Sequence, residues 1–172
     1  MDLERNLIDN ILECEIKLGH ASLTVSFYYP CRSLLELLQC KEEQLPAAIK
    51  IFQQNHQGRL GDVVIEELVS EKGRYVITVT ASGVDWVSTN YQPSEFMKLF
   101  VAEITNPNND LQDILKVFQR FSANIEVKEI SEEEWAVRFC DSSIDPYVYH
   151  IERNFFGLEY HRFTQEAYEN LI

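Results

Sequence analysis

Apolar side chains near the start of the chain recur at steps of three and four residues, the spacing of one face of a helix. These residues are Leu3, Leu7, Ile11, Cys14 and Leu18. Gly19 follows directly, and glycine often ends helices because it adopts the left-handed backbone conformation without steric cost. The pattern therefore predicts an amphipathic helix over residues 3–18.

A strand and two further helices are predicted next. Residues 22–29 are rich in β-branched and aromatic side chains and stop at Pro30, which favours a strand. Ser33 and Glu36 have the spacing of a capping box, so a helix is predicted to begin there. Pro46 marks the first turn of another helix, where the missing N–H of proline has no helical partner to lose.

A β-hairpin is predicted after these helices. Two runs of β-favourable residues, 63–69 and 74–80, are joined by a polar tip that includes Gly73. Such a tip between two strand-like runs is typical of a hairpin. The pattern at residues 84–88 does not distinguish a helix from a strand.

The periodicity fades at residues 88–94, which end in Gln92-Pro93-Ser94 and predict a boundary. We therefore expect one part at residues 1–90 and a second at 91–172, unless the two form a single compact domain. The second part is predicted to hold two helices, three or four strands and a short helix: 95–104, 111–121, 125–130, 135–140, 147–153, 158–163 and a helix from Thr164.

These elements predict an α+β fold, with the first part packed on a second part that contains an antiparallel sheet. A hydrophobic fraction of 45% in 172 residues is enough for a sizeable core. The 28 acidic residues outnumber the 15 basic ones, and the net charge of −13 repels phosphate backbones and anionic membrane surfaces. Since no apolar run approaches the ~20 residues that span a bilayer, no membrane partner is expected.

The order helix, strand, helix, helix, hairpin in residues 3–80 resembles the winged-helix family, in which the third helix enters the DNA groove and the hairpin forms the wing. The passage Val79-Thr80-Ala81-Ser82-Gly83-Val84-Asp85-Trp86-Val87 is similar to the leucine-threonine-x-x-glycine-x-x-x-aliphatic passage that follows the wing in many bacterial members. The loop at Lys41-Glu42-Glu43 lacks the glycine common in the family's turn, which leaves the crossing angle of the two helices open.

This resemblance implies a DNA-recognition helix near residues 46–57. It would expose Lys50, Gln54 and Gln57, with Arg59 just beyond its end, and these residue types can contact bases or phosphates. Residues 16–61 carry five basic and three acidic residues, a charge of +2 that leaves −15 for the rest of the chain. Because DNA affinity depends on neutralising several phosphates, we favour protein contacts over nucleic acid as the use of this fold.

The whole chain also resembles an uncharacterised bacterial family that is described only as a domain of unknown function. The passages that carry this resemblance are Asp145-Pro146-Tyr147-Val148-Tyr149-His150 and Phe156-Gly157-Leu158-Glu159-Tyr160-His161-Arg162-Phe163-Thr164. It implies no activity, cofactor or site.

A candidate metal site lies in the last predicted hairpin. If residues 154–157 form its loop, antiparallel register sets His150 opposite His161 and Glu152 opposite Glu159, all on one face. Opposed residues stand ~4.5–5.5 Å apart at Cβ, close enough for two imidazoles and a carboxylate to meet one divalent ion. The opposite face is apolar and belongs in a core, so a solvated sheet face is the first interpretation and a metal the alternative.

Familiar catalytic signatures are absent from the sequence, which has no GxxxxGK[ST], GxGxxG, HExxH or GxSxG motif. Cys31, beside Arg32, is the cysteine best placed for an electropositive setting. We favour the interpretation that it packs at a strand-to-helix junction. No catalytic residue is therefore assigned.

The cysteines Cys14, Cys31, Cys40 and Cys140 form no CxxC pair, and the chain has no N-x-S/T sequon, which favours a reducing cytoplasm. We therefore expect a cytoplasmic, non-enzymatic binding protein that needs no cofactor and whose partner is a protein. The alternatives are a winged-helix DNA-binding regulator and a metal-dependent hydrolase that uses the hairpin cluster.

Overall fold

The computed structural model describes residues 1–56 and 58–170. The chain divides into two compact units, Met1–Pro93 and Ser94–Ile172, and the division falls inside the Gln92-Pro93-Ser94 passage. Both units combine helices with an antiparallel sheet, so the fold is α+β as predicted. Across the described residues, no helix has both the length and the apolar character needed to cross a bilayer.

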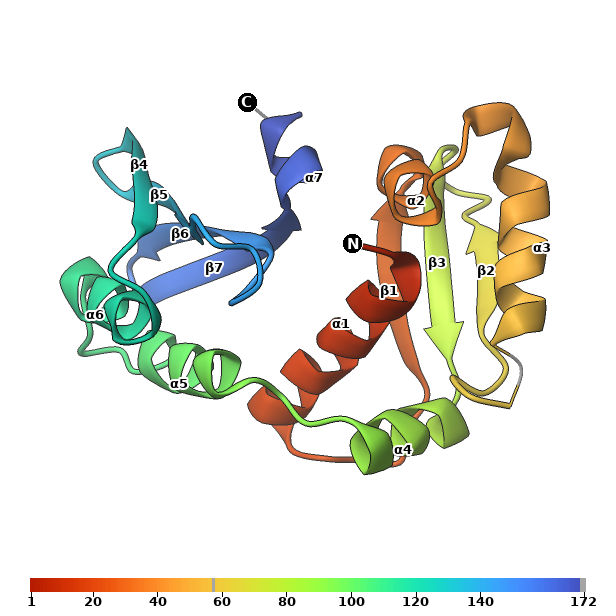
Figure 1. The fold of residues 1–172 in the computed structure, drawn as a ribbon, viewed down its shortest axis with the longest axis horizontal. Helices are drawn as coiled ribbons and strands as arrows, with labels where there is room; N and C mark the ends of the chain where they lie inside the picture. Colours follow the sequence, from red (N-terminus) through yellow and green to blue (C-terminus); the bar gives the residue numbers. More distant parts are fainter. Residues whose placement is uncertain (57, 171–172) are drawn as a thin grey trace. The chain divides into compact units, whose positions relative to one another are not determined.

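The first unit follows the predicted order of elements (Figure 1). In chain order they are α1 (Leu3–Leu18), β1 (Val25–Pro30), α2 (Cys31–Leu38), the 3-10 turn η1 (Glu42–Gln44), α3 (Leu45–Asn55), β2 (Val64–Glu67), β3 (Arg74–Val79) and α4 (Ala81–Asn90). Its sheet has the strand order β1-β3-β2 with antiparallel pairing throughout. The ambiguous residues 84–88 therefore belong to a helix, α4.

The core of the first unit is built from the apolar stripe of α1, from α2 and from the sheet. Leu7 of α1, Leu34 of α2 and Ile77 of β3 are fully buried in one cluster. The 3.6-residue period of α1 and the two-residue period of β3 each place an apolar face on this cluster. The predicted helix 3–18 is confirmed to the residue.

The prediction that Ser33 and Glu36 form a capping box at the start of this helix is wrong. α2 begins at Cys31, directly after β1, and its N-cap is Pro30 in extended conformation, without a side-chain cap. The Cys31 N–H donates to the carbonyl oxygen of Gly73 at 2.8 Å, in the turn between β2 and β3. This tertiary hydrogen bond satisfies a free amide of the first helical turn and lets the helix begin before Ser33.

The turn after α2 is made without glycine. Gln39 takes the left-handed conformation at φ 52° and ψ 46° and ends α2. The short turn η1 then leads directly into α3, and Pro46 lies in the first turn of that helix as predicted. α2 and α3 contact each other despite the missing glycine.

The second unit consists of α5 (Glu95–Ile104), α6 (Leu111–Phe121), β4 (Ile125–Ser131), β5 (Glu134–Phe139), β6 (Tyr147–Asn154), β7 (Gly157–Thr164) and α7 (Gln165–Glu169). The strands form an antiparallel sheet in sequence order. α5 and α6 pack together, and an aromatic cluster joins them to the sheet. Its members are Phe96, Phe100, Phe118, Phe121, Phe139, Tyr149 and Tyr160.

Candidate functional site

The sheet of the second unit has two different faces. The rings of Phe139 and Tyr149 contact Phe96 of α5, so one face lies on the helices. Since side chains alternate along a strand, Arg138 and Val148 point to the other side, here called the outer face. The short helix α7 contacts β6 and β7, and its side chains line a pocket on the outer face together with residues of β4, β5 and β6.

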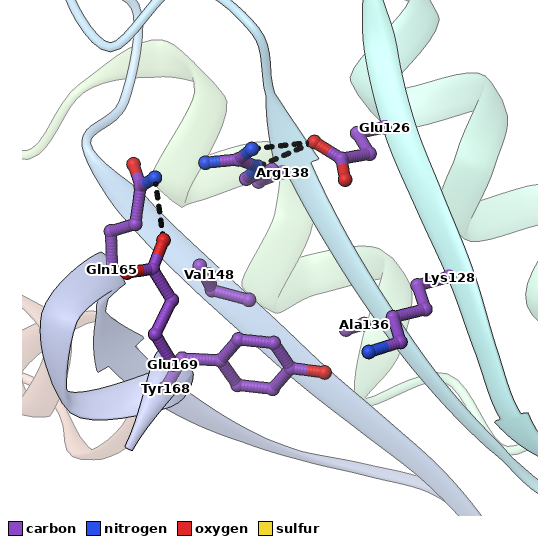
Figure 2. Close-up of a pocket in the computed structure, with 8 residues that line it drawn as sticks. All are labelled: Glu126, Lys128, Ala136, Arg138, Val148, Gln165, Tyr168 and Glu169. Atoms are coloured by element: carbon purple, nitrogen blue, oxygen red, sulfur yellow. Dashed lines mark hydrogen bonds and ion pairs between the residues drawn. The ribbon is translucent and has the colours of Figure 1, made fainter. Parts of the chain in front are cut away.

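A pocket lies between the outer face and α7 (Figure 2). Its volume is about 170 Å³. The lining residues are Glu126, Lys128, Ala136, Arg138, Val148, Gln165, Tyr168 and Glu169. Ala136 and Val148 are buried and apolar, whereas most of the other side chains that line the pocket are charged or polar. The pocket therefore has an apolar base, and mainly ionisable side chains form its walls.

Two hydrogen-bonded pairs hold part of this lining in place. Arg138 donates through Nε and Nη2 to Oε2 of Glu126 at 2.7 and 2.6 Å. On α7, the Gln165 amide donates to Oε1 of Glu169 at 3.1 Å. Figure 2 shows both pairs, one on the strands and one on the helix. The pocket thus has a preformed wall on each side.

Within the part of the chain that the structure describes, two further groups at the pocket have no hydrogen-bonding partner. The Tyr168 hydroxyl is buried without a partner among the described residues. Burial, and then the Glu126 carboxylate, raise the pKa of Tyr168, so its hydroxyl stays protonated at neutral pH and can donate. Lys128 is exposed, and in the described part of the chain no hydrogen bond or ion pair holds its ammonium group.

The predicted register of the last hairpin is confirmed. His150 pairs with His161 and Glu152 with Glu159, and Asn154 pairs with Gly157 around the two-residue turn. The two imidazole rings are stacked with centroids 6.5 Å apart, and His150 Nε2 lies 3.7 Å from Glu134 Oε2. Among the residues that the structure describes, no three His, Cys, Asp or Glu side chains are grouped so that they could hold a metal ion. The pairing is present, but a metal site remains a prediction.

Among the described residues, those predicted to contact DNA do not gather into a basic surface. Lys50 and Gln54 are exposed on α3, next to Ile51, whose side chain is also exposed. Arg59 pairs with the Glu4 carboxylate and lies over the Trp86 ring at 5.8 Å. Gln57 lies outside the described residues. The turn between β2 and β3 adds Glu71, which pairs with Arg74.

The turn of the last hairpin consists of two phenylalanines. Phe155 is 95% and Phe156 82% exposed, and their rings meet edge to face with centroids 5.4 Å apart. The Asn154 side chain accepts a hydrogen bond from the Phe156 N–H at 2.9 Å, and Gly157 follows with φ 131°. The turn is thus held in a defined conformation that displays both rings, here called the Phe tip.

Five glutamates lie at the same end of the sheet as the Phe tip. Glu134, Glu152 and Glu159 stand directly opposite one another across β5, β6 and β7 on the outer face. The exposed Glu132 and Glu133 form the turn before β5, and the carbonyl oxygen of Glu133 accepts the N–H of Arg153, two residues before Phe155. We call these five glutamates the acidic collar.

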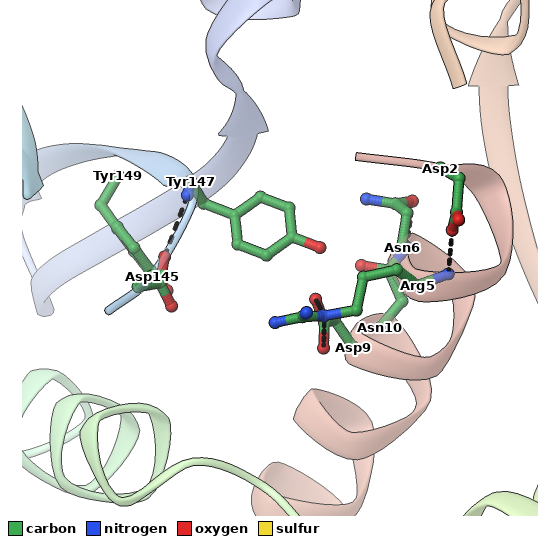
Figure 3. Close-up of polar contacts among 8 residues, drawn as sticks. All are labelled: Asp2, Arg5, Asn6, Asp9, Asn10, Asp145, Tyr147 and Tyr149. Atoms are coloured by element: carbon green, nitrogen blue, oxygen red, sulfur yellow. Dashed lines mark hydrogen bonds and ion pairs between the residues drawn. The ribbon is translucent and has the colours of Figure 1, made fainter. Parts of the chain in front are cut away.

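Other polar groups near buried positions have structural roles. In α1, the Asn6 side chain accepts from the Tyr29 hydroxyl at 2.6 Å, which ties the helix to β1, and Arg5 pairs with Asp9 at 3.1 Å. In the second unit, Asp145 accepts from the Tyr149 hydroxyl at 2.9 Å and from the Tyr147 N–H at 3.0 Å. Figure 3 shows these residues of α1 and of the Asp145 loop. Each contact fixes the backbone within its own unit.

Cys31 is half-buried at the junction of β1 and α2, as the packing interpretation predicts. Burial, followed by the carboxylates of Glu42 and Glu67, raises the pKa of the Cys31 thiol. The thiolate that a nucleophile requires is therefore disfavoured. All four cysteines are free thiols.

Sequence reasoning missed both the pocket and the Phe tip. The tip had a visible signal, because Asn154 and Gly157 flank two apolar residues at turn positions that normally favour polar ones. The sequence also contained a signal for the strand residues of the pocket, because Glu126 and Lys128, and likewise Ala136 and Arg138, are two residues apart and so lie on one face of their strand. No signal in the sequence indicated that α7 would lie on that face.

Comparison with known proteins places the chain in a family. A family model described as "Domain of unknown function, E. rectale Gene description (DUF3877)" matches residues 1–172. No curated protein and no solved structure shows a significant match. The match spans the full sequence and agrees with the uncharacterised bacterial family that the two C-terminal passages resemble. The chain therefore belongs to the DUF3877 family, a domain of unknown function.

Proposed function

We propose that this chain is a non-enzymatic, cytoplasmic interaction protein that binds a protein partner through the Phe tip. The partner carries an apolar cleft with a basic rim. The observation that supports this proposal is the pair of almost fully exposed phenylalanines in the hydrogen-bonded turn of a hairpin. Soluble proteins rarely leave adjacent large aromatic side chains in water without a use for them.

Aromatic side chains dominate the energetics of interfaces. Burying a phenylalanine side chain contributes roughly 1.5–3 kcal/mol, and energetic hot spots are enriched in large anchors that fill pockets on the partner. The Phe tip loses little conformational entropy on binding, because the Asn154 hydrogen bond already holds the turn. It therefore has the properties of a preorganised anchor.

The acidic collar indicates the charge of the partner. Glu134, Glu152 and Glu159 are like charges in direct opposition, an arrangement that is unfavourable in isolation. A basic rim on the partner would relieve this repulsion and would also be attracted by the net charge of −13. A second copy of this chain or an anionic membrane would be repelled instead.

In the same proposal, the first unit has a winged-helix-like architecture that serves protein contacts. Its support is the strand order β1-β3-β2, the contact of α2 with α3 and the Thr80-x-x-Gly83 passage after the hairpin. The exposed part of α3 has one charged residue, Lys50, beside Ile51 and Gln54. Such a face suits a protein surface better than a row of phosphates.

Photo-crosslinking followed by a binding measurement tests the proposal. A benzophenone amino acid at position 156 should give a defined adduct in the cell, whereas the same probe at Val69, in the exposed turn between β2 and β3, should not. With the purified partner, Phe155→Ser/Phe156→Ser should weaken binding about a hundredfold, the loss of a hot spot of ~3 kcal/mol. Val69→Ser is the matched control and should bind as the wild type does.

Salt provides the second readout. Since the acidic collar faces a basic rim, the association rate should fall as the ionic strength rises. Binding that survives the double serine variant would refute the role of the Phe tip. A dimer of this chain that the double variant dissolves would show that the tip serves self-association and that the partner assignment is wrong.

The two alternative functions, DNA binding and a metal site, can each be tested separately. DNA binding by Lys50, Gln54, Gln57 and Arg59 predicts retention of random duplexes at low salt and a steep loss with added salt. A metal site at the paired histidines predicts uptake of zinc by the metal-free protein, abolished in a His150→Ala/His161→Ala variant. A negative result in either titration removes that alternative.

A further inference from the structure

The pocket on the outer face has the size of a small-metabolite site. Its volume of about 170 Å³ is far more than one water molecule needs. It is smaller than the ~300–1,000 Å³ clefts that enclose drug-sized ligands. Its apolar base, Ala136 and Val148, is buried, so a ligand needs a small apolar part that can lie on these two residues.

The donors of the pocket suit a carboxylate. Arg138 is already paired with Glu126, whereas Lys128 has no partner in the described chain. Among the described residues the buried Tyr168 hydroxyl also lacks a partner, and a buried polar group without a hydrogen bond is costly. Figure 2 shows the Tyr168 ring extending from α7 over the sheet, with its hydroxyl directed toward the strand that carries Lys128. Both donors line the same cavity.

The acceptors suit a cationic group. Glu169 lies on the α7 side of the pocket and is held by Gln165 through Oε1, which leaves Oε2 without a partner in the described residues. The ionised groups of the lining, Lys128 and Arg138 against Glu126 and Glu169, cancel in charge. A simple anion would meet two carboxylates and a simple cation two basic groups, so a ligand with both charges fits best.

We propose that this pocket binds a small zwitterion, a free amino acid with a short aliphatic side chain. Its carboxylate accepts from Lys128 and Tyr168, its ammonium group donates to Glu169, and its side chain lies on Ala136 and Val148. A peptide cannot replace it, because either terminus of a peptide brings only one of the two charges. The site lies outside the Phe tip and is independent of the partner proposed there.

Calorimetric titration of the full chain with L-alanine, L-valine and L-leucine tests the proposal. We expect saturable binding with one site per chain. Isovalerate lacks the ammonium group of valine and isobutylamine lacks its carboxylate, and each should bind at least about tenfold more weakly than valine, the loss of a charge-assisted hydrogen bond. Both halves of the zwitterion are thus tested with the same aliphatic part.

Variants then locate the site. Lys128→Gln and Tyr168→Phe should each weaken valine binding about tenfold or more. Phenylalanine keeps the ring that contacts Phe163, so loss of the hydroxyl is separated from loss of α7 packing. Lys116→Gln, an exposed lysine of α6 paired with Asp113, is the control and should bind as the wild type does.

Three outcomes would overturn the assignment. The first is that none of the three amino acids binds at concentrations up to about 10 mM, which is beyond the millimolar dissociation constants of ordinary weak sites. The second is equal affinity for isovalerate and valine. The third is an unchanged affinity for valine in both pocket variants. These variants leave Phe155 and Phe156 in place. A negative amino-acid titration therefore does not affect the proposed protein interaction, and a negative result for the Phe tip does not affect the proposed pocket.

Discussion

Phe96→Ala is expected to lower the free energy of unfolding of the second unit by ~3–5 kcal/mol. Phe96 is 2% exposed and is the centre of the aromatic cluster. Its ring contacts those of Phe100, Phe118, Phe121, Phe139 and Tyr149, which come from two helices and two strands. Alanine would remove all these contacts and leave a cavity that rigid neighbouring rings cannot fill.

Trp135 is the natural reporter for this measurement, because the chain has only two tryptophans and the other, Trp86, belongs to the first unit. Urea unfolding followed by fluorescence in a Trp86→Phe background would measure the second unit alone. Phe155→Ala is the matched control: the same substitution at a side chain that is 95% exposed should change stability by no more than ~0.5 kcal/mol. Equal effects of the two substitutions would contradict the aromatic core described above.

Gly83→Ala is expected to destabilise the first unit by about 3 kcal/mol or more and to lower its midpoint of thermal unfolding by ~12 °C or more. Gly83 lies in α4, where alanine normally stabilises a helix by roughly 1 kcal/mol. A Cβ atom at this position would lie 1.9 Å from the Leu60 carbonyl oxygen and 2.7 Å from Cγ1 of Val79. Relief requires a shift of backbone, which a packed core resists.

Gly73→Ala separates this packing effect from ordinary glycine effects. Gly73 has φ +84° in the hairpin turn, but a Cβ there meets no atom within 4 Å. Its substitution should cost only the left-handed backbone strain, ~1–2 kcal/mol. Trp86 fluorescence in a Trp135→Phe background reports both variants. If Gly83→Ala is as stable as the wild type, the close approach of α4 to Leu60 is refuted.

The Gly83 contact also gives the Thr80-x-x-Gly83 passage a physical meaning. In the sequence, this passage supports only a resemblance. In the structure, Thr80 is the N-cap residue of α4 and Gly83 is the point where α4 meets the chain segment before β2. The glycine is required because two backbones approach there, which no local pattern of the helix reveals.

Several features of this chain follow from local pattern alone. Residues 3–18 form a helix because their apolar side chains keep the helical period. Leu3, Leu7 and Ile11 of that stripe are buried, whereas Cys14 is half-buried and Leu18 is exposed. The pairing of His150 with His161 follows from the position of one tight turn, since strand register is set once the loop length is known. Both depend on neighbours in sequence, and this is why they could be predicted.

Other features were decided only by contacts between residues distant in sequence. The start of α2 depends on a hydrogen bond from the Cys31 N–H to the Gly73 carbonyl oxygen. The position of α4 depends on the close approach of Gly83 to the backbone of Leu60. The pocket exists because α7 lies on the outer face, where Tyr168 meets residues of β4 and β5. Periodicity in a sequence determines which face of an element is apolar, but not which partner covers that face or how closely. That choice is made by side-chain packing in three dimensions, and so the tertiary structure alone determined the candidate site.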